Sequence, residues 1–205
     1  MLFRSPNRFP LGKSHFDIPT FEEAIELIQG LNKTTGREAG LEPELKAPTF
    51  HAHEGLPVEA AFWEVCKKYG YDSADAKMWV QCFEPKPLKT LRQELGCPLR
   101  MLQLVASSKI QDALVTEKGL DEIATYANAV GPNKERITGN PEIVKWAHAR
   151  GLDVHIYTLH ADAIPKGYAS FNEELEDIYV RCGVDGAFCD HPDLSSAFLD
   201  ARGLR

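Results

Sequence analysis

The sequence lacks the features that mark a membrane protein or a nucleic-acid-binding protein. No apolar run approaches the roughly 18 residues that cross a bilayer, and the segment Met1–Pro10 has no apolar core of a signal peptide. Positive charge is scarce, because 23 Lys and Arg stand against 30 Asp and Glu, for a net charge of −7. We therefore expect no membrane span and no nucleic-acid partner, and the compartment stays open.

Motifs for several kinds of catalysis are also missing. No glycine-rich phosphate or dinucleotide fingerprint follows a predicted strand, and there is no HExxH or EF-hand pattern. No nucleophile is paired with a base and an orienting acid. The cysteines show no CxxC or Cys/His spacing, so we interpret them as mostly buried, reduced thiols and not as a metal site or a disulfide framework. They are Cys66, Cys82, Cys97, Cys182 and Cys189.

What the sequence does contain is typical of a soluble globular protein. Of its 205 residues, 43% are hydrophobic and 26% are charged, and this length favours a single domain. We expect one partial barrel domain over 1–205, in which 1–40 form a proline-bearing loop and then a helix. That helix begins at Thr20, which forms a capping box with Glu23.

Beyond residue 40, predicted strands and helices alternate in six units. The strands are predicted over 41–47, 78–83, 99–105, 127–131, 152–158 and 184–190. The helices are predicted over 57–69, 88–95, 120–126, 141–151, 172–183 and from 193 onward, with Asn172 and Asp193 as caps and with His51 and His53 left in a loop. Such alternation implies parallel strands joined by right-handed crossovers. It favours a (β/α)₈ barrel, an α/β fold of eight units, from which two units are absent.

Ligand-handling residues in such a barrel lie at the carboxyl ends of the strands. Glu44 and Lys46 lie on one face of the first predicted strand, and on an interior face they would have to pair or hold a ligand. Glu44 suits Mg²⁺ or Ca²⁺, and Lys46 suits a phosphate oxygen. Other polar residues of the strands and loops each have a structural alternative, as hydrogen-bond partners, caps or solvated side chains. They are His51, His53, Gln81, Gln103, Asn128, His155, Tyr157, Thr158 and Asp190.

Several segments spread over essentially the whole chain are similar to one family. They are Arg8–Ser14, Thr20–Glu23, Pro43–Pro48, Val80–Phe83, Leu102–Leu104, His155–Thr158 and Val184–Asp193. The most specific are Pro-Glu-aliphatic-Lys at 43–46 and Asp-Gly-x-Phe-x-Asp-x-Pro-Asp at 185–193. In these the chain resembles glycerophosphodiester phosphodiesterases of the bacterial periplasmic type.

The resemblance implies a fold, an activity and a set of residues. The fold would be a (β/α)₈ TIM barrel of the phosphodiesterase type, incomplete, with about six units present and the first two missing. The activity would be metal-dependent hydrolysis of glycerophosphodiesters to glycerol 3-phosphate and an alcohol, with one Ca²⁺ or Mg²⁺. Glu44 would be a metal ligand and Lys46 would lie near the phosphate, while Gln81, Gln103 and Tyr157 would line the pocket. Members of this type are often periplasmic or secreted.

The chain departs from the family where the chemistry is done. The family's His-Arg-Gly, Glu-x-Asp and His-Asp motifs are absent, so no catalytic residue is assigned and the metal site would be incomplete. We expect the chain to be inactive alone, because those motifs carry the family's chemistry. We also expect it to be poorly stable alone, because open sheet edges invite self-association or a complementing amino-terminal fragment. Three interpretations stay open: a phosphodiesterase whose gene model starts late, a non-catalytic phosphodiester- or partner-binding remnant, and an unrelated barrel enzyme with Lys46 as Schiff-base former.

Overall fold

The protein is described by a computed structural model that covers residues 17–204, so most of the predicted loop over 1–19 lies outside the described residues. The chain divides into two compact units, Met1–Ala39 and Gly40–Arg205, which we describe separately. The first contains helix α1 (Phe21–Thr35). The predicted capping box is confirmed, because the Glu23 N–H donates to Thr20 Oγ1 at 3.2 Å and the Thr20 N–H donates to Glu23 Oε2 at 2.7 Å.

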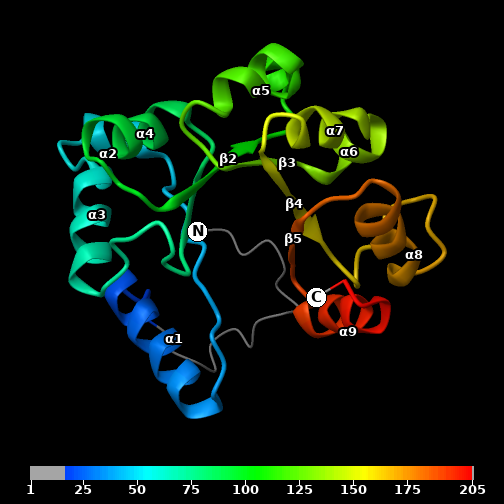
Figure 1. Cartoon of the computed structure of the whole chain (residues 1–205), viewed down its shortest axis with the longest axis horizontal. Coiled ribbons are helices and arrows are strands. Elements are labelled where there is room, and N and C mark those ends of the chain that lie inside the picture. The colour runs from blue at the N-terminus through cyan, green and yellow to red at the C-terminus, as the bar shows by residue number, and fades with distance from the viewer. Residues whose placement is uncertain (1–16, 205) are drawn as a thin grey trace. The chain divides into compact units, whose positions relative to one another are not determined.

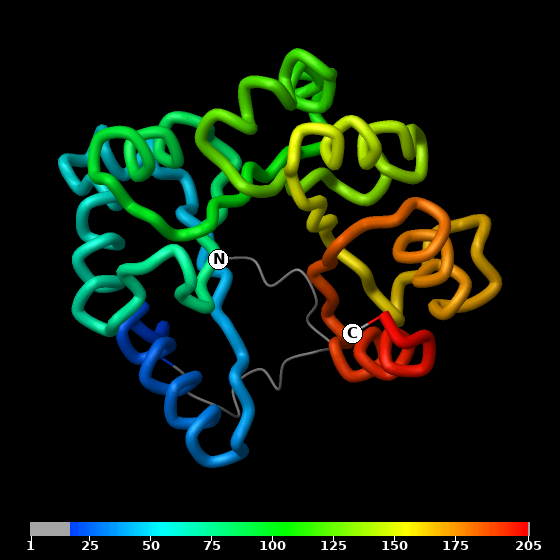
Figure 2. Tube along the Cα trace, in the orientation of Figure 1, coloured from blue at the N-terminus to red at the C-terminus, as the bar shows by residue number. Residues whose placement is uncertain are grey.

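The second unit is built on a parallel sheet of five strands that curls into a half-barrel, which confirms the predicted incomplete α/β barrel (Figure 1). The strands pair in chain order, each with the next. They are β1 (Trp79–Cys82), β2 (Arg100–Val105), β3 (Ala129–Pro132), β4 (Asp153–Leu159) and β5 (Gly186–Cys189). Figure 2 shows the chain passing around the sheet, with the helices on its outer side.

Helical segments connect the strands. Those before β2 are α2 (Pro48–His53), α3 (Val58–Lys68), α4 (Pro85–Lys89) and η2 (Thr90–Glu94). Those between β2 and β4 are η3 (Lys109–Val115), α5 (Glu117–Ile123), α6 (Lys134–Gly139) and α7 (Glu142–His148). Those after β4 are α8 (Phe171–Leu175), η4 (Glu176–Arg181) and α9 (Pro192–Arg202). Within residues 17–204, no helix has the length and apolar character to cross a membrane.

The first predicted strand, 41–47, is not a regular strand, although it runs parallel to β1 through two isolated bridges. Leu41 exchanges hydrogen bonds with the Lys77 carbonyl and the Trp79 N–H, at 3.0 and 2.8 Å. Further along, the Gln81 N–H donates to Pro43 at 3.0 Å and the Leu45 N–H donates to Gln81 at 2.9 Å. The hydrogen bond missing from this series is the one that the N–H of residue 43 would donate, and proline has no N–H. Pro43 therefore divides a continuous ladder into two bridges.

Two predicted helix caps are wrong. Ser170, not Asn172, caps α8, because Ser170 Oγ accepts the Glu173 N–H at 3.2 Å and Glu173 reaches back to the Ala169 N–H. His191, not Asp193, precedes α9, because Pro192 takes the first helical position. The predicted loop with His51 and His53 contains helix α2, which also begins at a proline.

The concave face of the sheet carries one apolar cluster. Leu102, Leu104 and Ala129 are buried there, with Trp79, Phe83 and Tyr157 packed against them. The Trp79 ring on β1 lies 4.9 Å from the His155 ring on β4, although two strands separate them. Side chains of non-neighbouring strands meet in this way only on the inside of a curled sheet, so this face is the interior of the half-barrel.

Candidate functional site

Glu44 and Lys46 form an ion pair beside β1. Lys46 Nζ lies 3.0 Å from Glu44 Oε2, and the exposed fractions of the two side chains are 80% and 20%. Because side chains alternate along an extended segment, Glu44 shares a face with Glu42, whose carboxylate reaches His155 on β4. We infer that the pair lies on the concave side, with the ammonium in solvent.

Glu42 is a site neighbour for which the sequence analysis assigned no role. Its Oε1 lies 3.3 Å from His155 Nδ1, so a residue beside β1 is tied to β4 across the concave face. The Gln81 carboxamide adds a second tie, because its Nε2 donates to the Glu42 carbonyl at 2.8 Å. Together these contacts hold the segment that carries Glu44. Glu42 lies two residues before Glu44, on the same face of the extended segment, and this spacing is the sequence signal that could have identified it.

Tyr157 lies on the concave face, packed against the apolar cluster. Its hydroxyl donates to the Val105 carbonyl at 3.1 Å, and its ring packs edge-on against Phe83 at 5.7 Å. Burial raises the pKa of Tyr157, and the negative charges of Glu135 and Glu44 raise it further, against the opposing effect of Arg136. Gln81 and Tyr157 therefore both lie on the side of the sheet where the candidate site is.

Gln103 is a correction to the predicted set of pocket residues. It stands between Leu102 and Leu104 on β2 and points to the opposite, helix-covered face, where it is 0% exposed. Its Nε2 donates to the carbonyls of Cys82, Phe83 and Leu104, and its Oε1 accepts the Tyr126 hydroxyl at 2.9 Å. These bonds use its hydrogen-bonding capacity, so its role is structural.

Asn128 is also structural. It precedes β3, at the amino end of the strand and not at the predicted carboxyl end. Its Oδ1 accepts from Arg92 Nη2 at 2.9 Å and from the Met101 N–H at 3.1 Å. The residue ties η2 to β2 on the side of the sheet away from the carboxyl ends.

A histidine–carboxylate pair lies at the carboxyl ends of β4 and β5. His160 Nδ1 is 3.0 Å from Asp190 Oδ2, with exposed fractions of 34% and 41%. The neighbouring His191 faces the backbone instead, because its Nδ1 accepts the Ala161 N–H at 3.1 Å. His160, together with Tyr157 and Thr158, lines a cavity of about 430 Å³ at the carboxyl ends of β3 and β4.

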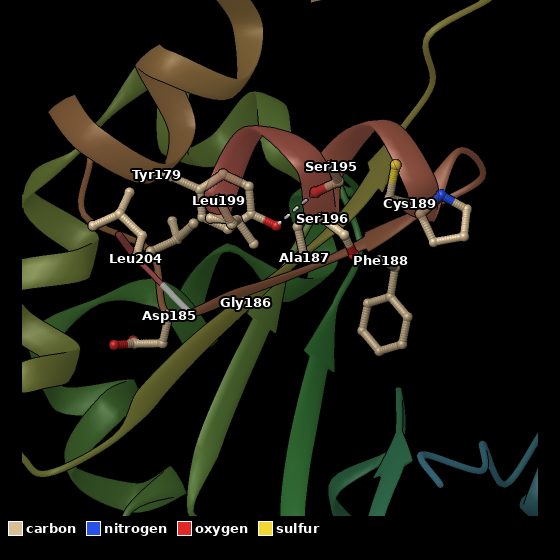
Figure 3. Close-up of a pocket in the computed structure, with 12 residues that line it drawn as sticks. Tyr179, Asp185, Gly186, Ala187, Phe188, Cys189, Ser195, Ser196, Leu199 and Leu204 are labelled. Atoms are coloured by element: carbon tan, nitrogen blue, oxygen red, sulfur yellow. Dashed lines mark hydrogen bonds between the residues drawn. The ribbon is translucent and has the colours of Figure 1, made fainter. Parts of the chain in front are cut away.

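A cavity of about 670 Å³ lies between β5 and α9. In the described part of the chain β5 pairs with β4 alone, so its other edge is open. In Figure 3 the Phe188 ring points away from α9, whereas Ser195 and Leu199 project towards the strand. The Tyr179 hydroxyl lies 3.4 Å from Ser195 Oγ at the back of the cavity.

The described residues do not form a complete divalent-metal site. No group of three or more His, Cys, Asp or Glu side chains between residues 17 and 204 is placed to hold an ion. Ca²⁺ takes six to eight oxygen ligands, and Mg²⁺ requires near-octahedral geometry. Glu44 offers one carboxylate, and one of its oxygens is paired with Lys46. A metal here needs ligands beyond these residues.

Comparison with known proteins decides the family. A sequence model of the glycerophosphoryl diester phosphodiesterase family matches residues 3–194. The chain belongs to this family. A glycerophosphodiester phosphodiesterase of Haemophilus influenzae is 36% identical over 98% of this chain and 63% of that protein. One from Treponema pallidum is 28% identical over 94% of this chain and 62% of that protein. The chain therefore spans less than two thirds of the length of either relative.

Solved structures of the family show the same fold. A structure from Silicibacter pomeroyi superposes with a TM-score of 0.69 at 22% identity, over 91% of this chain and 57% of that one. A glycerophosphodiester phosphodiesterase from Parabacteroides distasonis superposes with a TM-score of 0.63 at 14% identity, over 90% of this chain and 65% of that one. At these identities the likeness concerns the fold alone.

Proposed function

We propose that this phosphodiesterase-family chain takes part in the hydrolysis of glycerophosphodiesters to glycerol 3-phosphate and an alcohol. The observation that carries the proposal is the Glu44–Lys46 pair beside β1, on the concave face of a half-barrel. The Lys46 side chain is 80% exposed, so a non-bridging phosphate oxygen can approach its ammonium group from solvent. Glu44 is held in place by the ties that Glu42 makes to Gln81 and His155.

We further propose that the chain does not turn over substrate alone. The described residues supply one carboxylate to a divalent cation, and the family's His-Arg-Gly, Glu-x-Asp and His-Asp motifs do not occur in the sequence. A single general acid or base contributes about 10²–10⁴-fold to rate, so a chain without these motifs loses more than one such factor. A complementing polypeptide that carries those motifs would supply the remaining Ca²⁺ or Mg²⁺ ligands.

The open edge of β5 is the place that suits such a complement. An extended segment could add to this edge as a further strand. The adjoining cavity between β5 and α9 has room for its side chains, next to apolar groups such as Ala187 and Leu199. Self-association through the same edge is the competing outcome, and it would appear as a dimer in the isolated chain.

The second candidate function is phosphodiester binding without hydrolysis. It is favoured because no group of three or more His, Cys, Asp or Glu side chains within residues 17–204 is placed to hold a metal ion. The Schiff-base alternative has less support, because a lysine of that kind is normally desolvated and Lys46 is 80% exposed. Borohydride trapping of a carbonyl substrate on Lys46 would revive it.

The test is hydrolysis of glycerophosphocholine with Ca²⁺ or Mg²⁺, by the chain alone and with a fragment that carries the three family motifs. We expect turnover only in the mixture, and its loss in Glu44→Gln. Lys46→Met tests the contact with the phosphate. Its matched control is Lys145→Met, which changes an exposed lysine on α7 and leaves the rate unchanged. Binding without turnover in every mixture would establish the second candidate, and no binding would contradict both.

A further inference from the structure

Arg100 is the first residue of β2, and its guanidinium lies on the concave face of the half-barrel. Leu102 and Leu104, further along the strand, belong to the apolar cluster of that face, and side-chain alternation points Arg100 the same way. Arg100 also pairs in register with Trp79 on β1, and its Cζ lies 4.7 Å from the centre of the Trp79 ring. This cation–π contact holds the guanidinium inside the half-barrel, at the amino ends of the strands.

The guanidinium of Arg100 has a buried donor that is not used. Its Nε is buried and has no hydrogen-bond partner among the described residues. By contrast, the Nε atoms of the partly buried Arg92, Arg136 and Arg150 each donate a hydrogen bond, at 3.2, 2.8 and 2.7 Å. Leaving a buried donor of a charged group unsatisfied costs more free energy than leaving a neutral one. Arg100 is therefore the arginine whose surroundings are incomplete.

The acidic side chain at this end of the concave face is already paired. Glu42 Oε1 lies 3.3 Å from His155 Nδ1, and the His155 ring packs against the same Trp79 ring at 4.9 Å. Trp79 thus contacts both Arg100 and the imidazole of the Glu42–His155 pair. Within residues 17–204 no carboxylate forms an ion pair with Arg100, so its charge is unbalanced on this face.

The position of Arg100 indicates which group is missing. The interior of a closed barrel is filled by side chains from all of its strands, so the strands that complete this barrel would project into the space that Arg100 faces. Closure would also remove water from the rest of the guanidinium, and a buried cation needs an anionic partner. The backbone carbonyls of a closed sheet are used between strands. A carboxylate, however, accepts the planar guanidinium through two parallel hydrogen bonds.

We propose that the amino end of the concave face, formed by Arg100, Trp79, His155 and Glu42, is a docking surface for the complementing polypeptide. Arg100 receives an Asp or Glu side chain of that polypeptide. This inference rests on the proposed function, because it takes from it the complement that completes the barrel. It names a recognition contact in addition to the open edge of β5. It assigns Arg100 to assembly and leaves the chemistry to the carboxyl ends of the strands.

The test is co-expression of the chain with the part of the Haemophilus influenzae relative that it does not match, and measurement of the dissociation constant of the complex. We expect Arg100→Met to raise this constant about thirtyfold or more, because it leaves the partner's carboxylate buried and unpaired. The matched control is Arg181→Met, which changes an arginine on η4 that is 59% exposed and leaves the constant unchanged.

Unfolding of the isolated chain separates docking from a structural role. We expect the urea midpoint of Arg100→Met to be no lower than that of the control. The reason is that Met still packs against the Trp79 ring while an unsatisfied buried donor is removed. A lower midpoint would show that Arg100 stabilises the isolated chain, and it would overturn the inference.

Arg100→Lys is a second variant, and it identifies the partner side chain. A carbodiimide joins the new amine to a carboxylate in direct contact, forming an amide bond with loss of water, and mass spectrometry of the digested product locates the acidic residue. We expect the link to fall on an Asp or Glu of the complement. A link to Glu42 of the same chain would overturn the inference.

The possible results distinguish this inference from the proposed function. Hydrolysis of glycerophosphocholine by the mixture, with equal dissociation constants for Arg100→Met and the control, would overturn the inference and leave the proposed function standing. A complex that depends on Arg100 but does not hydrolyse glycerophosphocholine would support the inference and overturn the proposed hydrolysis. The absence of any complex would overturn both the docking surface and the complement.

Discussion

Replacing Lys134 by Met would leave a carboxylate buried without its cation. Lys134 Nζ is 2.7 Å from Glu174 Oε1, and the side chains are 9% and 1% exposed. The other carboxylate oxygen, Glu174 Oε2, is buried and has no hydrogen-bond partner among the described residues. Removing one partner of such a pair costs about 3–5 kcal/mol. We expect Lys134→Met to lower the free energy of unfolding by that amount, a large part of the stability of a small domain.

The double variant separates the pair's contribution from the desolvation cost. Lys134→Met with Glu174→Met removes both charges, and we expect its stability to lie within about 1 kcal/mol of the parent chain or above it. Urea unfolding followed by circular dichroism measures each variant, with the slope checked for constancy. The exposed pair Lys145–Glu142, 72% and 50% exposed, is the control, and Lys145→Met leaves stability unchanged. A Lys134→Met variant as stable as this control would refute the reasoning.

Further predictions concern buried and partly buried groups. Gln103→Leu leaves the Tyr126 hydroxyl without its acceptor, so we expect the free energy of unfolding in urea to fall by about 1–3 kcal/mol. We expect ligand binding to be unchanged, and weaker binding would show that Gln103 lines the pocket. Cys66 and Cys82 resist a thiol reagent at pH 8 until the chain unfolds, because burial raises the pKa of each to about 12. Since unfolding releases those protons, the free energy of unfolding declines as the pH rises from about 9 towards 12, and a flat profile would contradict the burial. Glu42→Leu costs about 1 kcal/mol and Glu42→Gln less, because Gln can keep the hydrogen bond to His155.

The sequence was sufficient for the order of the five strands β1–β5 and for the shared face of Glu44 and Lys46, but it did not predict α2, η3 or α6. Alternation along 41–47 placed Glu44 and Lys46 together, and the structure pairs them. Alternation could not show which of Gln81 and Gln103 faces the concave side. Strands such as β1 and β2 are apolar on both faces, so no pattern marks the inner one. Only the pairing of β1 with β2, and the contact of Trp79 with His155, shows that Gln103 points outward.

Other features depend on distances that the sequence does not contain. His160 and Asp190 are thirty residues apart in the chain, and they meet because β4 and β5 are neighbours in the sheet. The π-helical turns η2 and η4 depart from the period of 3.6, so periodicity predicted plain helices there. The interruption at Pro43 could have been predicted from the sequence, because a proline cannot donate a hydrogen bond to a strand ladder.

The central claim is that Lys46 receives the phosphoryl group of a glycerophosphodiester, beside the Glu44 carboxylate that would bind a divalent cation. The most direct measurement is the dissociation constant of glycerophosphocholine for the chain and for Lys46→Met, by calorimetry at fixed ionic strength. We expect binding to be weaker by about fivefold in the variant, because a mostly exposed charge contributes about 1 kcal/mol. Equal dissociation constants for the two proteins would contradict it.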